Sequence, residues 1–233
     1  MSILVSVIIL IIIALIQDLL QLVPGVFASF YHYAVGKKNR KFADSLSLYF
    51  LLGNEVFIIT IFFILCTLFF TINNFFEINT IYLYWILAGI FTAETTISLF
   101  LYYRKGKFTE LFISRNTASN LEKQSKNVKT PSDAFILGFL SRVPELFFTL
   151  PLYLLAIILL IDFLVVPRAL ILILFIFISL LPIIIIHLFY FTGHNLSHIE
   201  RFRIKIKPFI KIFLSLSFLS LATLIIIGIF NHG

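Results

Sequence analysis

Long apolar runs separated by short polar segments constrain this chain more than any other feature. The runs lie at about residues 2–35, 45–71, 79–103, 133–164, 167–192 and 209–230. A helix needs about 20 predominantly apolar residues to cross the hydrocarbon core of a bilayer. Charged residues make up only 12% of the 233 residues, whereas a soluble domain has about 25%. The sequence therefore predicts an all-α integral membrane protein of six transmembrane helices, with the lipid bilayer as its solvent.

The first and fourth runs are longer than one span requires, and each contains a proline, Pro24 and Pro144. Proline removes a backbone donor, and its ring clashes with the preceding helical turn. We therefore expect helices 1 and 4 to be long and proline-broken, either as tilted, interrupted helices or as helices with a re-entrant piece.

The basic residues predict how the chain is oriented. Of the 18 Lys and Arg residues, 16 lie in three loops, at 36–44, 104–132 and 193–211, whereas the connections at 72–78 and 162–168 are nearly free of them. Loops rich in Lys and Arg face the cytoplasm. This pattern predicts a multi-pass protein of the plasma (cell inner) membrane with both termini outside. It does not indicate a nucleic-acid partner, because the net charge of +7 belongs to these loops.

The chain divides into two three-helix halves, 1–103 and 133–233, joined by a basic cytoplasmic linker at 104–132. Because three is odd, the halves would have inverted orientations. A weak echo at an offset of 120 supports this: Val23-Pro24-Gly25 matches Val143-Pro144-Glu145. The alternative is two unrelated, proline-kinked helices. For the linker, either a short amphipathic helix or a mobile loop near the anionic inner leaflet would fit.

Ionisable residues inside the apolar runs are the main functional signal. Helical rise places four acids and one arginine near the middle of the bilayer, and a histidine falls in the fifth run: Asp18, Glu55, Glu94, Glu145, Arg142 and His187. A charge at that depth is costly and by default marks a functional cavity. The excess of acid favours bound protons or a bound cation. The alternative is structural, with Arg142 paired to Glu145 and the other groups hydrogen-bonded between helices.

Helix breaks at matching places in two halves expose backbone groups that can hold a substrate. Together with the ionisable residues they predict a substrate- or ion-binding site between the halves. Its candidate members are Asp18, Gln21, Pro24, Gly25, Glu55, Glu94, Arg142, Pro144, Glu145 and His187.

Enzyme chemistry has no positive support in the sequence. Neither H-E-x-x-H, G-x-S-x-G, a P-loop nor G-x-G-x-x-G occurs, so we expect no enzyme and no cofactor. His187, His194 and His198 have spacings that could share a helical face, but Gly193 interrupts that helix, so metal binding is left open. The single cysteine, Cys66, cannot form an internal disulfide.

Several short motifs resemble the lysine-exporter superfamily. They are Leu22-Val23-Pro24-Gly25, Gly36-Lys37-Lys38, Leu52-Gly53-Asn54 and the segment 138–145. The resemblance implies a six-helix exporter of amino acids or metal ions built from two related halves. Two positions depart from the amino-acid exporters: Val26 replaces a second proline, and Val143-Pro144-Glu145 stands where that group usually has Asn-Pro-Lys. These departures leave the amino-acid substrate open.

The sequence as a whole predicts a secondary transporter, an exporter of a small solute or cation that is coupled to protons and could form a homodimer. The alternative is a non-transporting membrane subunit or scaffold whose intramembrane charges pair with a partner protein.

Overall fold

The computed structural model describes residues 3–19, 22–37, 40–76, 79–100, 115–161, 163, 165–191 and 196–232. These residues are almost entirely helical and contain no strand, which confirms the all-α prediction for the described part of the chain. In chain order the elements are α1 (Ile3–Leu19), α2 (Leu22–Lys37), α3 (Arg40–Phe76), α4 (Thr80–Phe100), α5 (Arg115–Asn127), α6 (Pro131–Ser141), the 3₁₀ helix η1 (Val143–Glu145), α7 (Leu146–Ile161), α8 (Val165–Phe191) and α9 (Leu196–His232).

In the part of the chain that the structure describes, four helical stretches are long and apolar enough to cross a membrane: Lys41–Asn73, Thr80–Phe100, Pro131–Ile161 and Phe209–Phe230. Two shorter apolar helices, Ser6–Gln17 and Leu170–Ser179, fall within the first and fifth predicted runs. Four of the six predicted spans are therefore found at full length among the described residues. The count of six stays a prediction.

The fourth apolar run is interrupted at its proline. Helix α6 ends at Ser141, Arg142 forms a turn, and η1 carries Pro144 before α7 begins. Within η1 the backbone N–H of Glu145 donates to the carbonyl of Arg142 at 3.0 Å, the tighter bond of a 3₁₀ turn. The expected proline break is confirmed here. The first run is likewise described as two helices, with residues 20 and 21 between them outside the described part.

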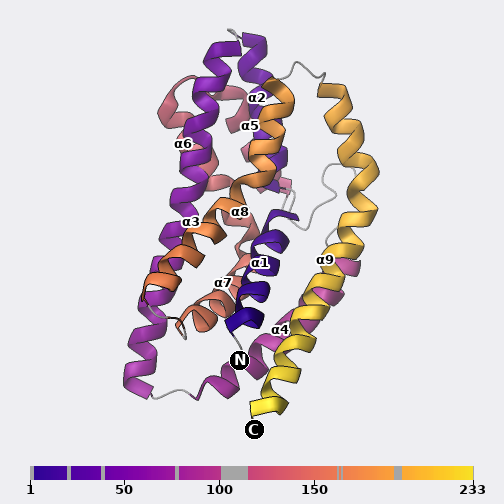
Figure 1. Cartoon of the computed structure of the whole chain (residues 1–233). Helices are drawn as coiled ribbons and strands as arrows, with labels where there is room; N and C mark the ends of the chain where they lie inside the picture. Colours follow the sequence, from indigo (N-terminus) through magenta and orange to yellow (C-terminus); the bar gives the residue numbers. More distant parts are fainter. Residues whose placement is uncertain are drawn as a thin grey trace.

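Helices α3 and α9 are the two long pillars of the molecule (Figure 1). Each has 37 residues, about 55 Å at 1.5 Å per residue, so both exceed the roughly 30 Å hydrocarbon core of a bilayer. Their outer faces carry large exposed apolar side chains, such as Phe63 and Phe213. Exposed surface of this kind is suited to lipid.

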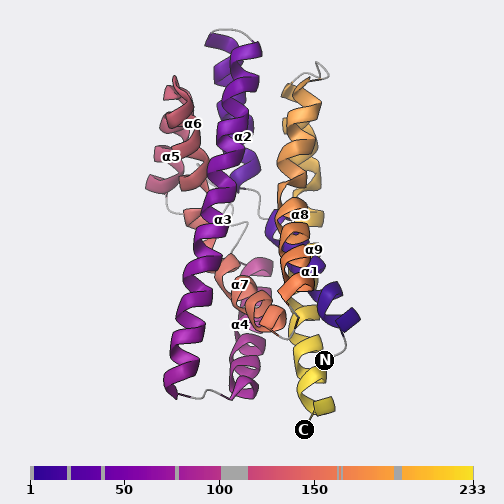
Figure 2. The same ribbon diagram turned by 60° about the vertical axis from the view of Figure 1, so that its left-hand side comes forward.

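The main helix pairs are α3 with α6 and α4 with α9, followed by α1 with α8 and α2 with α5. In Figure 2, α6 descends beside the upper part of α3, and α7 then continues below it. Two glycines let α3 and α6 come unusually close. A Cβ on Gly53 would lie 2.0 Å from the carbonyl oxygen of Phe135, and a Cβ on Gly138 would lie 2.1 Å from that of Phe50. Only glycine fits at these positions.

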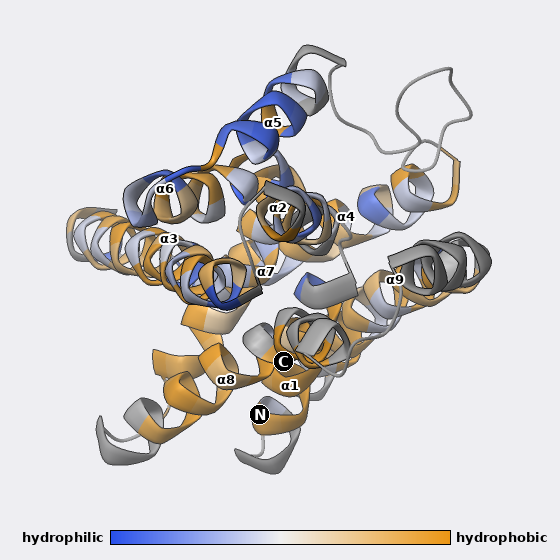
Figure 3. Cartoon of the chain, turned by 90° about the horizontal axis from the view of Figure 1, so that it is seen from above, coloured by the Kyte–Doolittle hydropathy of each residue, from blue (hydrophilic) through white to orange (hydrophobic). Residues whose placement is uncertain are grey.

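The second part of the predicted linker is a helix that packs on α2. The hydroxyls of Ser29 and Ser125 lie 3.2 Å apart, and the Nζ of Lys126 lies 5.4 Å from the centre of the Tyr33 ring. Leu121 is buried against the same helix group. Viewed from above, α5 is the most hydrophilic helix, whereas α1 and α8 are almost wholly apolar (Figure 3). Of the two alternatives for the linker, a short helix is therefore found for its part Arg115–Asn127.

Candidate functional site

The centre of the candidate site is Arg142, in the turn where α6 ends. Its Nε donates to Oδ1 of Asn54 at 2.6 Å, and its Nη1 lies 3.6 Å from Oε2 of Glu145. The amide Nδ2 of Asn54 in turn donates to Oε1 of Glu55 at 3.1 Å. We call these four residues (Asn54, Glu55, Arg142 and Glu145) the Arg142 cluster. It joins α3 to the broken fourth segment.

The Arg142 cluster lies between two apolar cores. Along α3, Phe50 belongs to a core shared with α2, α5 and α6, whereas Ile58 belongs to a second core shared with α1, α4, α7 and α9. Along the fourth segment, Leu137 belongs to the first of these cores and Phe148 to the second. All four cluster residues are buried; Arg142 and Glu145 are each 3% exposed. The charges are therefore enclosed halfway along the molecule.

The break at Pro144 places Arg142 and Glu145 in this position. The pair is confirmed as the i, i+3 contact that the sequence allowed, but it lies in a turn and a 3₁₀ helix rather than in a regular α-helix. The close approach at Gly53 and Gly138 brings the neighbouring Asn54 within reach of Arg142. A proline break and a glycine contact together build the cluster.

The electrostatics of the cluster are unbalanced. Two carboxyl groups face one guanidinium, and Oε2 of Glu55 has no hydrogen-bond partner among the described residues. The Tyr153 hydroxyl lies in the field of Arg142, Glu145 and Glu55, next to Thr149. A buried charge that is not fully compensated costs several kcal/mol. The arrangement can therefore accept a proton, a cation or a ligand with a positive or donor group.

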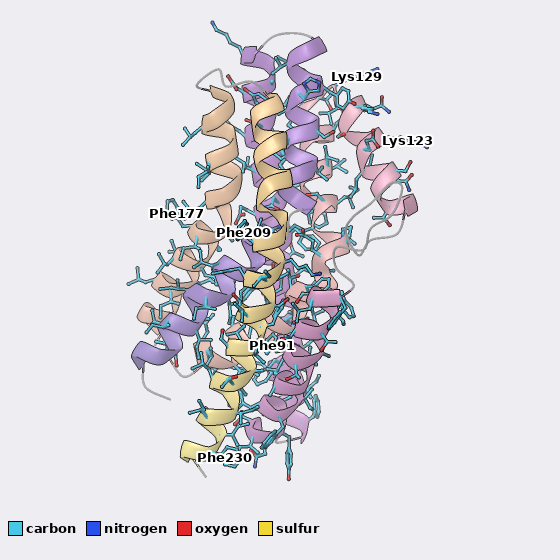
Figure 4. All side chains as sticks on the ribbon, turned by 90° about the vertical axis from the view of Figure 1, so that its right-hand side faces the viewer. Phe91, Lys123, Lys129, Phe177, Phe209 and Phe230 are labelled. Carbon is cyan, nitrogen blue, oxygen red and sulfur yellow. The ribbon has the colours of Figure 1, made fainter. Side chains whose placement is uncertain are left out.

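Glu94 lies apart from the Arg142 cluster. It occupies the face of α4 that packs on α9, between Phe91, whose ring stacks on Phe218, and Ser98, whose hydroxyl is 2.7 Å from that of Ser215. In Figure 4, Phe91 marks this α4–α9 interface. Glu94 is 2% exposed, and neither of its carboxyl oxygens has a hydrogen-bond partner among the described residues. The expected single pocket therefore holds three of the predicted charges and not Glu94.

The remaining predicted site residues differ in what can be said of them. Pro144 lies in η1 within the cluster's turn, and Gly25 lies half-buried on α2. Gln21 and the side chains of Asp18, Pro24 and His187 lie outside the described part of the chain. Asn54 is the residue that sequence reasoning missed as a ligand of Arg142. Its signals in the sequence were its place beside Glu55 in an apolar run and its membership of the Leu52-Gly53-Asn54 motif.

Three aromatic rings pack together about two helical turns beyond the Arg142 cluster along α3 and α7, and we call them the aromatic plug. Phe62 of α3, Tyr153 of α7 and Phe175 of α8 have ring centres 5.1 to 6.5 Å apart. Beyond this aromatic plug lies a cavity of about 330 Å³ between α1, α3, α4, α7 and α9. Its walls are mostly aliphatic, and its polar members are Asn73, Asn79, Thr80 and Tyr84. Along both α3 and α7 the order is therefore cluster, plug and cavity.

Among the residues that the structure describes, no group of three or more His, Cys, Asp or Glu side chains could hold a metal ion. Of the histidines considered for metal binding, His194 and the side chains of His187 and His198 lie outside that part.

No family model, curated protein or solved structure matches this chain. The resemblance to the lysine-exporter superfamily therefore stays a prediction, carried by the short motifs alone.

Proposed function

We propose that this chain is a membrane-embedded secondary transporter, an exporter that moves a small solute or cation through the Arg142 cluster. The observation that carries the proposal is a buried, unbalanced charge network at a helix break halfway along the molecule. Glu55 lies near the middle of the span Lys41–Asn73. Ionisable groups at such a depth mark transport pathways by default.

Several helix pairs support an inverted repeat, although the packing of α2 on α3 has no counterpart of similar extent between α7 and α8. In the proposed repeat, the pair α1 and α2 corresponds to α6 and α7, α3 corresponds to α8, and α4 corresponds to α9. The packing of α3 on α6 then has its counterpart in α1 on α8, and α4 on α9 is its own counterpart. The packing of α3 on α7 and of α2 on α6 likewise has counterparts in α2 on α8 and α1 on α7. Such repeats place a transport site where their broken helices meet.

The distribution of charge supports an orientation with the basic loops in the cytoplasm. The C-terminal ends of α2 and α8 lie at the upper end of Figure 1, whereas the C-terminal ends of α3 and α9 lie at the lower end. The predicted loops 36–44 and 193–211 are largely helical, because α3 begins at Arg40 and α9 at Leu196. Most of their basic residues therefore lie in the first turns of α3 and α9, at the opposite end of these helices from the bare connection after α3, which supports the cytoplasmic assignment. In this orientation the cavity opens on the outer side, and the aromatic plug separates it from the Arg142 cluster.

The burial of the charges favours a transporter over a scaffold subunit. A scaffold would direct its intramembrane charges to a partner's helices. Arg142 and Glu145 instead pair with each other inside the chain and are almost fully buried.

The test uses purified protein in phospholipid vesicles on a solid-supported membrane, where charge movement is recorded during concentration jumps of amino acids or divalent cations. We expect a saturable current for one class of probe, and its loss in Glu55→Gln. Glu122→Gln is the matched control, because Glu122 is an exposed acid paired with Lys126 on α5. An unchanged current in Glu55→Gln would contradict the role of the Arg142 cluster as the transport site. A complete absence of current with both classes of probe would contradict the transporter function.

A further inference from the structure

The buried carboxyl of Glu94 is not used by the Arg142 cluster, although it lies at one of the two most extensive helix contacts. Helix α4 carries no other acidic or basic side chain along Thr80–Phe100. Among its described neighbours, α9 brings one titratable group towards this region, Lys211, half-buried one turn before Ser215. The titratable side chain of α7, Tyr153, lies instead in the field of the Arg142 cluster. Neither forms an ion pair or hydrogen bond with Glu94 in the described structure.

A carboxylate cannot be held in such a place. An ionised carboxyl without a partner costs far more to bury than a neutral one, so the group keeps its proton. The flanking contacts are a stacked pair of phenylalanine rings on one side and a pair of serine hydroxyls on the other. Neither contact supplies a charge. Glu94 can therefore ionise only when water reaches it, and this requires the helices that cover it to move apart.

We propose that Glu94 is the proton-binding site of the transporter, separate from the solute site, and that separation of α4 from α9 controls proton exchange. The inference rests on the proposed function and adds the identity of the coupling ion and its residue. Helix α7 joins the two sites. It packs on α4, and it follows Glu145 directly in the chain. A shift of α4 away from α9 would move α7 and, with it, the end of the Arg142 cluster.

The protonation state can be measured without any knowledge of the solute. Infrared spectra of the protein in dodecyl maltoside, which has no carbonyl group, distinguish a neutral carboxylic acid from a carboxylate. At neutral pH, subtraction of the Glu94→Gln spectrum from the unmodified spectrum should leave the band of one neutral acid. Glu122→Gln is the control, and its difference spectrum should show one carboxylate instead, because that side chain is exposed and paired with Lys126. A carboxylate band for Glu94 overturns the inference.

The control of exchange is tested by a disulfide across the same interface. The hydroxyls of Ser98 and Ser215 are 2.7 Å apart, close enough for cysteines at both positions to be linked. In a Cys66→Ser background, the neutral-acid band of Ser98→Cys/Ser215→Cys should persist on transfer to alkaline buffer while the disulfide is intact. It should disappear after reduction. Equal loss of the band in both redox states overturns the proposed control by helix separation.

Flux measurements separate this inference from the function on which it rests. In vesicles, Glu94→Gln should still conduct downhill exchange of the transported probe but lose its stimulation by a pH gradient. A Glu94→Gln protein that is stimulated as strongly as the unmodified one overturns the coupling role alone. If the infrared and disulfide experiments give the expected results but the unmodified protein shows no flux, the proposed transporter function is overturned instead. Monodispersity on size exclusion and an unchanged melting temperature confirm that the variant is folded.

Discussion

The contact between α3 and α6 gives the sharpest prediction, because it requires that Gly53 and Gly138 have only a hydrogen atom as side chain. Gly53→Ala and Gly138→Ala would each place a methyl group about 2 Å from a backbone carbonyl oxygen of the opposite helix. Real Cβ atoms essentially never approach so closely. Gly89 provides the matched control, since a Cβ there would meet nothing within 4 Å. The same substitution is thus tested in two contexts on apolar helices of one chain.

The expected magnitude is the balance of two effects. Alanine favours a helix over glycine by roughly 0.5–1 kcal/mol, so Gly89→Ala should raise the free energy of unfolding by about that amount. Overpacking of a well-packed interior costs about 1–3 kcal/mol, and occasionally more. The obstacle at Gly53 and Gly138 is a rigid backbone carbonyl rather than a mobile side chain. We therefore expect Gly53→Ala and Gly138→Ala each to lose about 2 kcal/mol net, the upper end of the overpacking cost less the gain in helix propensity.

The assay is thermal unfolding in detergent, for which 1 kcal/mol corresponds to about 2–4 °C in a chain of this size. The double variant should lose less than the sum of the single losses, because one separation of the helices relieves both clashes. It should also weaken the bond between Asn54 and Arg142, which depends on the same approach. Variants at Gly53 and Gly138 as stable as Gly89→Ala would refute the close contact and, with it, the geometry of the Arg142 cluster.

Three further substitutions test the cluster, the plug and the surface. Arg142→Leu should cost about 3–5 kcal/mol by leaving buried acids uncompensated, and adding Glu145→Leu should recover part of the loss; a double variant less stable than the single would contradict the pairing. Phe62→Ala should cost about 3–5 kcal/mol in thermal unfolding and admit a membrane-impermeant maleimide from the cavity side to a Thr149→Cys reporter. An unlabelled reporter would show that the ring does not close the route. Glu122→Gln should leave the melting temperature unchanged, because its pair with the i+4 lysine is exposed; a clear shift would contradict the surface placement of α5.

The local features of the site could be predicted from the sequence. The break at Pro144 follows from the chemistry of one residue, which lacks a donor and clashes with the preceding turn. The pairing of Arg142 with Glu145 follows from their spacing along the chain. Both effects act within one or two helical turns, so no knowledge of the neighbouring helices was needed.

The relations between helices could not be predicted in this way. Helical rise gave the acids a similar depth, but depth does not say which neighbour a side chain faces. Glu94 faces α9, whereas Glu55 lies on α3 beside Arg142's partner Asn54. The choice depends on which helices pack together. Gly53 illustrates the difficulty: its importance lies in a carbonyl of a helix more than 80 residues away.

The two halves of the proposed repeat are unequal where they matter most. At the offset of 120, the position equivalent to Gly53 is Ile173, and the position equivalent to Arg142 is Leu22. Ile173 is 64% exposed, so α8 has no counterpart there of the close glycine contact that holds α3 to α6. The close contact between α3 and α6 and the Arg142 cluster beside it therefore have no equivalent between α8 and α1, their counterparts in the proposed repeat. Under the proposed mechanism, α3 and α6 should move as one body that carries the site, while the looser surface between α1 and α8 slides to admit water from the other side.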